Sequence, residues 1–311
     1  MKAIVCKKSG SPDVLKLEEI SKPTPKPNEI CVKVYASSVT RGDVKLRIIP
    51  RFILSVIGLM FGFKAMQVPG VEFAGEVESV GENVKDFKKG DQVFGTTTGL
   101  RFGGNAQYVC VPEKSKTGVV TKKPENISFS DATVIPVGGM TALYLLRKGN
   151  IKKDQKILIY GASGSVGSYA VQLAKFYRAK ITAVCSTNNI DLVRSIGADE
   201  VIDYTKEVFT ERGTEYDIIF DAVGKISKSR CKDILVKNGT YISVKSPTKE
   251  RLEDLLFLKK LIKEEEIKPI IDREYTLQEV VDAHRYVEGG HKKGNVVIKV
   301  EHSNHQLHNR L

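Results

Sequence analysis

A chain of 311 residues is long enough for two domains, each with its own hydrophobic core. Hydrophobic residues make up 41% of the chain and charged residues 28%, which is typical of a soluble globular protein. The 49 basic and 37 acidic side chains give a net charge of +12, but the bases are spread along the chain and often stand beside acids. This pattern favours a solvated basic surface, which attracts anionic cofactors, over a nucleic-acid interface, so we expect no nucleic-acid partner.

The N-terminus and the cysteines bear on the cellular compartment. Charge returns at Lys7, too early for a signal peptide, and the longest apolar run, residues 52–63, is too short to span a bilayer. Five cysteines are scattered along the chain without a close pair, which argues for free thiols in a reducing compartment: Cys6, Cys31, Cys110, Cys185 and Cys231. We therefore expect a cytoplasmic protein that has no membrane partner.

Residues 1–124 carry short alternating runs, such as "EICVKVYASSV" and "EFAGEVESVG", that are broken by Gly, Pro and Asn. That pattern predicts an antiparallel β domain. One segment differs, because "RFILSVIGLMFGFKAM" (residues 51–66) is longer and more apolar than a connection needs to be. It is either buried as core, or it forms a helical flap that walls a substrate pocket with Phe52, Met60 and Phe61 and places Arg47 at the rim.

In residues 125–264, apolar strands alternate with segments of helix length. The strands are "KILIYG", "KITAVCS", "EVIDY", "YDIIFDAVG" and "GTYISV", an order that predicts a parallel, doubly wound sheet. An amphipathic helix, "RLEDLLFLKKLIKEEE", comes next, and residues 265–302 read as a strand, a helix and a closing strand. We expect the polar end, residues 303–311, to be a disordered tail. The fold class is therefore α/β with two domains.

A run of small residues follows the first strand of this predicted sheet and precedes a helix. The run has the spacing Ala-x-Gly-x-x-Gly after an initial glycine: Gly161, Ala162, Ser163, Gly164, Ser165, Val166 and Gly167. Small residues let the backbone approach a pyrophosphate, whose charge is met by the N–H groups at the positive end of the helix. The context of strand, turn, helix and second strand favours dinucleotide binding over an ordinary tight turn.

The end of the second strand indicates which dinucleotide binds. A cofactor with a free ribose 2′-hydroxyl usually meets a carboxylate about 20 residues beyond the glycines. The chain has no acid between Gly167 and Asp191 and offers Ser186 and Thr187 instead, with Arg194 one helical turn further on. These donors suit a 2′-phosphate, so NADP(H) is preferred over NAD(H). Ser186 and Thr187 could also cap a helix, and the two roles are compatible.

Several blocks together resemble one known family. They are "VPGVEFAGEVESVGENVKDFKKGDQVFG", "GGNAQYV", "VGGMTALYLL", "YGASGSVGSYAVQLAK", "GADEVIDY" and "GHKKGNVVIKV". The chain resembles the zinc-free medium-chain dehydrogenase/reductases of the quinone oxidoreductase, or zeta-crystallin-like, branch. The resemblance implies a GroES-like β domain of residues 1–124, completed by residues 265–302, beside a Rossmann domain of residues 125–264. It places the active site in the cleft between the two domains.

The same resemblance implies further cofactor contacts. They are Thr141, Tyr204, Val223, Gly224, Ser243, Val244, Lys293, Gly294 and Asn295. Considered without the family, Thr141 could cap a helix, Tyr204 could anchor the end of a strand, and "KKGN" could be an ordinary turn.

The zinc-dependent sister branch binds its metal through a Cys, a His in a "GHE" segment, and a later Cys or Asp. Here the first position is Thr40, and "GHE" is replaced by Gly70, Val71 and Glu72. All five histidines lie at or beyond residue 284, and no four-cysteine lobe is present. We therefore expect no bound metal.

Without zinc to polarise an alcohol, the reduction of an electron-poor acceptor is the chemistry that asks least of the protein. We expect hydride transfer from NADPH to a quinone or an α,β-unsaturated carbonyl, with Thr40 and Asp43 as catalytic candidates. Asp43 and Arg47 could instead form a surface ion pair. A metal-independent alcohol dehydrogenase and a non-catalytic NADPH-binding protein are the alternatives. The β-branched segment Thr240–Val244, at the predicted sheet edge, suggests a homodimer.

Overall fold

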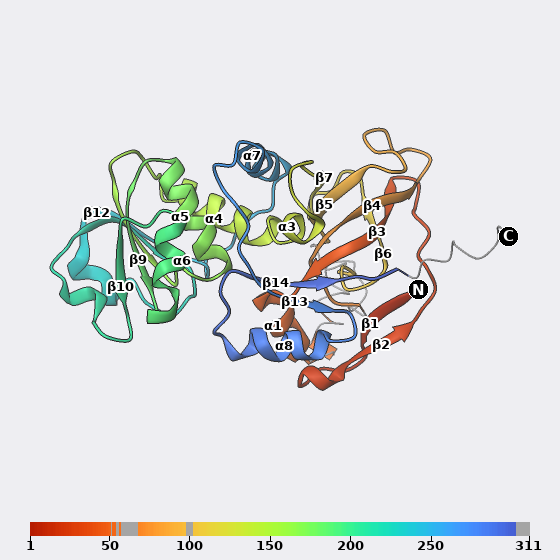
Figure 1. Cartoon of the computed structure of the whole chain (residues 1–311), viewed down its shortest axis with the longest axis horizontal. Helices are drawn as coiled ribbons and strands as arrows, with labels where there is room; N and C mark the ends of the chain where they lie inside the picture. Colours follow the sequence, from red (N-terminus) through yellow and green to blue (C-terminus); the bar gives the residue numbers. More distant parts are fainter. Residues whose placement is uncertain (51, 54–55, 57–67, 98–101, 303–311) are drawn as a thin grey trace.

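The computed structural model describes residues 1–50, 52–53, 56, 68–97 and 102–302. Two sheets lie side by side along the long axis of the molecule, with the N-terminus in the β domain (Figure 1). Met60, Phe61 and most of the predicted flap lie outside the described residues, as does the predicted tail at residues 303–311. Phe52 is described, and its side chain is 70% exposed.

The β domain contains a seven-stranded sheet in the order β13-β14-β3-β4-β5-β7, with β6 paired to β3, and a separate β1–β2 pair. The strands are β1 (Lys2–Cys6), β2 (Leu15–Glu19), β3 (Glu29–Ser38), β4 (Glu72–Val80), β5 (Gln92–Thr96), β6 (Tyr108–Pro112), β7 (Val120–Lys122), β13 (Ile271–Thr276) and β14 (Asn295–Lys299). Alternation places Ile30, Val32 and Val34 of β3 in one core. β14 pairs antiparallel with β3, so the C-terminal part of the chain joins this sheet.

Short helices cover the β domain. They are η1 (Pro12–Val14), α1 (Arg41–Ile48), α3 (Phe129–Thr133) and α8 (Val280–Gly289). α8 packs against α1 and η1, and α3 packs against β3, β4, β5 and β14. α3 therefore lies against the β domain although it follows the predicted boundary at residue 124.

Arg47 lies between α1 and α8 and is only 2% exposed. Its guanidinium donates to the carbonyl of Gly10 at 3.0 Å, pairs with Glu288 at 2.8 Å and lies 3.2 Å from Nδ1 of His284. The predicted position at the rim of a substrate pocket is therefore wrong, and so is the alternative of a surface pair with Asp43. The reason is that α8 returns from more than 200 residues along the chain to cover this face of α1, which no local pattern reveals.

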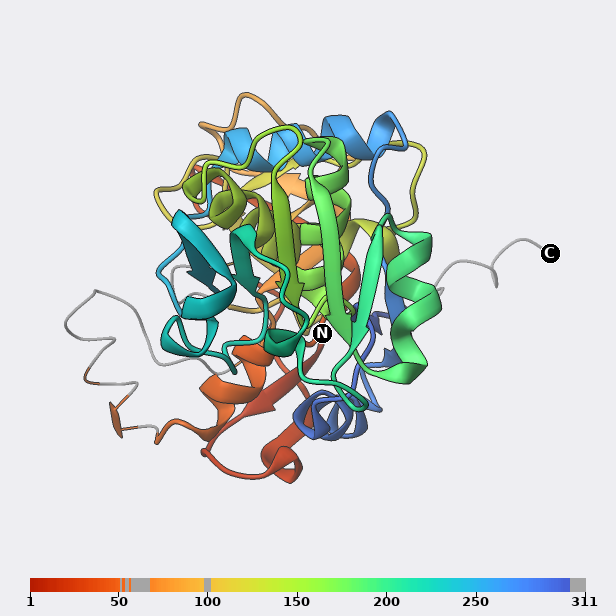
Figure 2. The ribbon, with the colours of Figure 1, turned by 90° about the vertical axis from the view of Figure 1, so that its left-hand side faces the viewer.

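The second domain contains a five-stranded parallel sheet in the order β10-β9-β8-β11-β12 (Figure 2). Its strands are β8 (Lys156–Tyr160), β9 (Lys180–Cys185), β10 (Glu200–Asp203), β11 (Tyr216–Asp221) and β12 (Leu235–Ser243). Its helices are α4 (Pro136–Lys148), α5 (Ser165–Phe176), η2 (Thr187–Asn189), α6 (Ile190–Ser195), η3 (Phe209–Glu211), η4 (Ser229–Ile234) and α7 (Leu252–Lys263). All five predicted strands are confirmed. The order reverses between β8 and β11, the switch point at which such sheets bind their ligands.

The two faces of the parallel sheet are covered differently. α4, α5 and α6 cover one face in the largest apolar core of the described residues, and α7 joins this core by packing against α4. The other face is covered by η3 and η4 with their flanking turns, through Phe209, Ile226, Cys231 and Ile234. Residues 205–215 and 225–233 contain few apolar side chains at helical spacing, so they form 3₁₀ turns where helices were expected.

α7, the predicted amphipathic helix, packs against both α4 and β7 and so contacts both domains. Asp254 near its start is fully buried and accepts hydrogen bonds from Arg147 of α4 and from Arg251, the latter at 2.8 Å. None of the helices in the described ranges has the length and apolar character that crossing a membrane would require.

Candidate active site

The glycine-rich run forms the turn between β8 and α5, and two of its glycines are required by packing. Gly161 has a φ of +79°, and a Cβ there would lie 2.6 Å from Val223 Cγ1. A Cβ at Gly167 would lie 2.2 Å from the carbonyl oxygen of Gly161. Both distances are too short for a side chain, so the turn folds closely onto the first turn of α5.

Gly164 is different because the protein itself leaves room beside it. A Cβ there would meet only the Gly161 oxygen, at 3.5 Å. Gly164 is also the N-cap of α5, and no side chain of the described residues caps this helix. The space and the uncapped N–H groups at the positive end of α5 fit the pyrophosphate of a dinucleotide.

The segment at residues 293–295 crosses this turn. The Gly294 N–H donates to the carbonyl of Ser163 at 2.7 Å, and Ser165 Oγ donates to Asn295 Oδ1 at 2.5 Å. The exposed Lys293 is fixed through its backbone N–H, which donates to Asp272 at 2.8 Å. Two parts of the predicted cofactor site, which lie more than 120 residues apart in the sequence, are therefore in direct contact.

A polar cluster stands where the adenosine end of the cofactor is expected. The amide of the buried Asn189 donates to Ser163 Oγ at 3.0 Å and to Ser186 Oγ at 3.1 Å, which ties the end of β9 to the glycine turn. Tyr204 is 48% exposed, and its ring centroid lies 6.3 Å from that of Tyr160. Arg194 is exposed on α6.

Asp203 corrects the expectation that no carboxylate stands at this point. It ends β10 and is the register partner of Cys185 at the end of β9, so a search limited to the residues after the glycines misses it. Thr187 donates to one carboxylate oxygen and Thr205 to the other, and these hydrogen bonds lower the pKa of Asp203. Because the Asp203 carboxylate accepts hydrogen bonds from these two hydroxyl groups, it fixes the orientation of the Thr187 side chain. Ser186 stays beside the glycine turn, where its Oγ accepts from Asn189.

Asp221 is a buried carboxylate that sequence reasoning missed. It ends β11 and accepts hydrogen bonds from the N–H groups of Val223 at 3.2 Å and Gly224 at 2.8 Å. It also accepts from Tyr241 at 3.2 Å and from Ser243 Oγ at 3.3 Å. Asp221 thereby fixes the turn at Gly224, whose φ is +73°, and links it to the end of β12. An acid at the end of a buried strand, just before a turn glycine, was the available signal.

α4 brings Thr141 to the same region. Gly138, one turn earlier on α4, lies against α5, because a Cβ there would be 2.6 Å from Ser165 Oγ. Thr141 is half-buried in the second turn of α4 and does not cap it, since Pro136 begins that helix.

Thr40 and Asp43 form a capping box at the start of α1. Thr40 Oγ1 donates to Asp43 Oδ2 at 2.6 Å, and the Asp43 N–H donates back to Thr40 Oγ1 at 3.1 Å. Asp43 also accepts from the Gly70 N–H at 3.3 Å and is 1% exposed, and burial raises its pKa. Both predicted catalytic groups are therefore engaged in holding the helix start.

Glu72 lies near this box and joins the two domains. Its side chain is 2% exposed and accepts from Ser38 Oγ at 2.5 Å and from the Val137 N–H, in the first turn of α4, at 2.7 Å. Burial raises the pKa of Glu72 to about 8, despite these hydrogen bonds, and the negative charge of Asp43 adds to the shift. In the sequence analysis Glu72 was noted only as part of the segment that replaces "GHE", where it cannot bind zinc alone.

Lys292 is a second group that the sequence did not indicate. Its ammonium donates to the Gly294 carbonyl, next to the glycine turn. Burial lowers the pKa of Lys292 to about 8, although the negative charges of Glu72 and Asp272 oppose the shift. Glu72 and Lys292 can thus both exchange protons near neutral pH.

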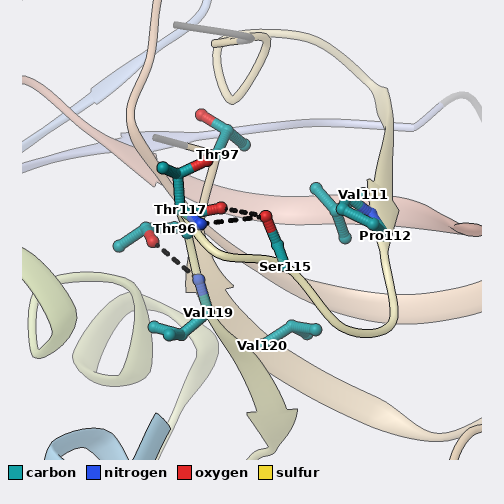
Figure 3. Close-up of a pocket in the computed structure, with 9 residues that line it drawn as sticks. Thr96, Thr97, Val111, Pro112, Ser115, Thr117, Val119 and Val120 are labelled. Carbon is teal, nitrogen blue, oxygen red and sulfur yellow. Dashed lines mark hydrogen bonds between the residues drawn. The ribbon is translucent and has the colours of Figure 1, made fainter. Parts of the chain in front are cut away.

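Metal ligands do not gather at this place in the described part of the chain. Among the residues that the structure describes, no group of three or more His, Cys, Asp or Glu side chains could hold a metal ion. A small hollow of about 10 Å³ lies elsewhere in the β domain, between β5 and β7 (Figure 3). It is lined by Thr96, Thr97, Val111, Pro112, Ser115, Thr117, Gly118, Val119 and Val120, and includes none of the predicted site residues.

Comparisons with known families and structures agree with this geometry. Residues 26–125 match the family described as Alcohol dehydrogenase GroES-like domain, and residues 165–282 match the one described as Zinc-binding dehydrogenase. Among solved structures, the quinone oxidoreductase from Coxiella burnetii is 28% identical with a TM-score of 0.83, over 97% of this chain and 99% of that one. The Escherichia coli quinone oxidoreductase complexed with NADPH is 26% identical with a TM-score of 0.81, over 96% and 100%.

Three curated relatives match most of the chain. The chloroplast envelope quinone oxidoreductase homolog of Arabidopsis thaliana is 32% identical over 90% of this chain and 92% of its own. The 2-methylene-furan-3-one reductase of Solanum lycopersicum is 35% identical over 93% and 76%. The chloroplastic NADPH-dependent alkenal/one oxidoreductase of Arabidopsis thaliana is 33% identical over 96% and 79%.

These relatives overturn the expectation of a cytoplasmic location. Two of the three, and two further relatives at 32% identity, are named as chloroplast proteins. The expectation was wrong because it rested on the lack of a signal peptide and of a bilayer-spanning run, and neither of these absences identifies a compartment.

We predict that Glu72→Gln flattens the pH dependence of stability. Because the pKa of Glu72 is raised from 4.5 to about 8, the folded protein keeps a proton that the unfolded chain releases between these values. This contribution to stability is complete below about pH 4.5 and is lost as the pH rises towards 8. Urea unfolding should show the wild type losing about 3 kcal/mol more than the variant between pH 5 and 8. Parallel pH profiles would contradict the assignment.

We predict that Gly164→Ala weakens NADPH binding without unfolding the protein. The added methyl group has room in the protein, but it occupies the space next to the uncapped start of α5. Fluorescence titration should show the dissociation constant of NADPH rising about tenfold, while the unfolding temperature stays nearly unchanged. Gly167→Ala is the matched control, because its methyl group would clash at 2.2 Å and destabilise the fold. Wild-type affinity in Gly164→Ala would place the pyrophosphate elsewhere.

Proposed function

Because this chain belongs to the medium-chain dehydrogenase/reductase family, in its quinone oxidoreductase branch, we propose that it transfers hydride from NADPH to a quinone or an α,β-unsaturated carbonyl without zinc. The broad activity agrees with the names of matched relatives, of which one is an NADPH-dependent alkenal/one oxidoreductase and another a 2-methylene-furan-3-one reductase. Our proposal that the mechanism uses no zinc is based on the side chains of this chain itself.

The observation that carries the cofactor assignment is the open, uncapped start of α5 at Gly164. The glycine turn would hold the pyrophosphate, and Ser186 would face the 2′-phosphate, with Arg194 contributing positive charge. The hydroxyl of the neighbouring Thr187 donates to Asp203. The further cofactor contacts that we propose are Thr141, which precedes the glycine turn in the chain, and residues that follow it: Tyr204, Val223, Gly224, Ser243, Val244, Lys293, Gly294 and Asn295. The bound nicotinamide supplies the hydride.

The zinc-free mechanism is supported by the side chains that stand at the zinc-ligand positions of the sister branch. Thr40 stands at the first ligand position of the sister branch and its hydroxyl caps α1. Gly70 and Val71 offer no ligand atoms in their side chains. Glu72 is held by Ser38 and by the Val137 N–H. Thr40 remains the proposed contact to the acceptor, and the buried Asp43 carboxylate fixes the orientation of the Thr40 hydroxyl.

We expect the purified protein to oxidise NADPH with quinones and enones, and to do so in the presence of a metal chelator. The measurement is NADPH absorbance against a panel of quinones, enones, aldehydes and secondary alcohols, with elemental analysis for zinc. Turnover of alcohols in chelator with little reduction of enones would select the metal-independent alcohol dehydrogenase. NADPH binding without turnover of any acceptor would select the non-catalytic protein. About one zinc per chain would overturn the metal-free site.

We also propose that the protein is a homodimer that pairs through β12. In the described residues β12 is the last strand of the parallel sheet and pairs only with β11. Its segment Thr240–Val244 carries no charge, and an unpaired edge strand of this kind tends to bind a partner strand. Two copies related by a two-fold axis could join their sheets at this edge.

Light scattering at micromolar concentration should give twice the mass of 34.4 kDa. Thr240→Lys, which places a charge on the edge strand, should shift the protein to the monomer mass while NADPH binding is kept. A monomer mass for the wild type contradicts the dimer, and a dimer that Thr240→Lys leaves intact contradicts this interface.

A further inference from the structure

Cys31 and Cys110 lie directly opposite one another on neighbouring strands. Cys31 is in β3 and Cys110 in β6, and they are register partners in the antiparallel β3–β6 ladder. This corrects the expectation that the chain has no close pair of cysteines. Almost 80 residues separate the two positions in sequence, so only the pairing of the strands brings them together.

The register places the pair at a site where the two side chains approach closely. At one end of the ladder the Val34 N–H donates to the Gln107 carbonyl, and at the other the Glu113 N–H donates to the Asn28 carbonyl. Hydrogen-bonded and non-hydrogen-bonded pairs alternate along an antiparallel ladder. Cys31 and Cys110 are three positions from either end, so they form a non-hydrogen-bonded pair. The Cα atoms of such pairs are about 4.5 Å apart, within the range that a disulfide spans.

The two thiols are on the face of the sheet away from the main core of the β domain. The flanking residues Ile30, Val32, Val109 and Val111 point into that core, so Cys31 and Cys110 point to the other side. Cys31 is fully buried, with its Sγ 3.8 Å from the carbonyl oxygen of Pro23. Cys110 is half-buried and can be reached from solvent.

A positive charge stands beside the pair. The Lys22 ammonium lies 3.9 Å above the Tyr108 ring and 2.9 Å from Glu78. A hydrogen bond from Cys110 and the charge of Lys22 lower the pKa of Cys31, against the opposing effects of burial and of Glu78. The same hydrogen bond raises the pKa of Cys110.

We propose that Cys31 and Cys110 are a modification site, at which a small-molecule disulfide such as oxidised glutathione converts the two thiols into a cross-strand disulfide. A cysteine thiolate of the pair attacks the oxidant, forms a mixed disulfide and releases one small thiol. The second cysteine sulfur then displaces the other small thiol and closes the Cys31–Cys110 bond. Two electrons pass from the cysteines to the oxidant, and the two thiol protons leave with the two small thiols.

The bond would stabilise the part of the β domain that supports Glu72. β6 follows Gly104, whose N–H donates to the Gly70 carbonyl, and Asn105, whose side chain accepts from Ser37 Oγ. Ser37 Oγ also donates to the backbone carbonyl of Glu72. Closing a loop of about 80 residues removes conformational freedom from the unfolded chain. Oxidation should therefore raise the unfolding temperature of the protein.

The test uses the full chain, equilibrated with mixtures of reduced and oxidised glutathione and then blocked with an alkylating agent. Peptide mapping should find one disulfide, between Cys31 and Cys110, and the oxidised wild type should unfold about 5 °C above the reduced protein. Cys110→Ser is the matched variant, because it removes the half-buried thiol and should abolish both the bond and the shift.

The mapping of the wild type decides the proposal even if the variant folds poorly. Glutathione attached to Cys110 with Cys31 still reduced would overturn it, as would both thiols remaining reduced at every glutathione ratio. A bonded wild type that unfolds no later than the reduced protein would overturn the proposed stabilisation.

Discussion

The close approach of Gly167 to the carbonyl of Gly161 is the contact on which the candidate site depends. Because a Cβ at Gly167 would lie only 2.2 Å from that oxygen, no side chain fits there, and α5 begins tightly against the end of β8. That placement leaves the α5 N–H groups uncapped and directed at the space next to Gly164. The closing segment at Gly294 can then pair with Ser163, and α4 can pack at Gly138 against Ser165. A side chain at Gly167 would separate these elements and disperse the site.

Around this turn, buried carboxylates hold the backbone in place. Asp221 organises the turn after β11, Asp43 closes the start of α1, and Glu72 links β4 to the first turn of α4. Each accepts backbone N–H or hydroxyl hydrogen bonds, which is what makes its burial tolerable. Burial raises the pKa of Asp43, and it raises the pKa of Glu72 to about 8, with the negative charge of Asp43 adding to the latter shift. The chain thus positions its candidate site with polar groups of the interior.

Some of these features follow from local sequence. The strand periods and the glycine spacing depend on residues within a few positions of one another, so they predicted the parallel sheet, its five strands and the cofactor turn. The same reasoning failed where two distant segments meet. Arg47 was placed at a pocket rim, but α8 covers it, and Asp203 reaches the end of β9 from the neighbouring strand. The pairing of Cys31 with Cys110 has the same origin.

The sequence by itself determined most of the strands and helices, the glycine-rich turn after β8 and the lack of the sister branch's zinc ligands, because each depends on residue identity and short spacing. Tertiary structure alone decided which polar groups are buried together. Burial raises the pKa of Asp43 and raises that of Glu72 to about 8, and burial lowers the pKa of Lys292 to about 8. Those properties depend on desolvation and on neighbours from other elements, and neither is encoded in a local pattern.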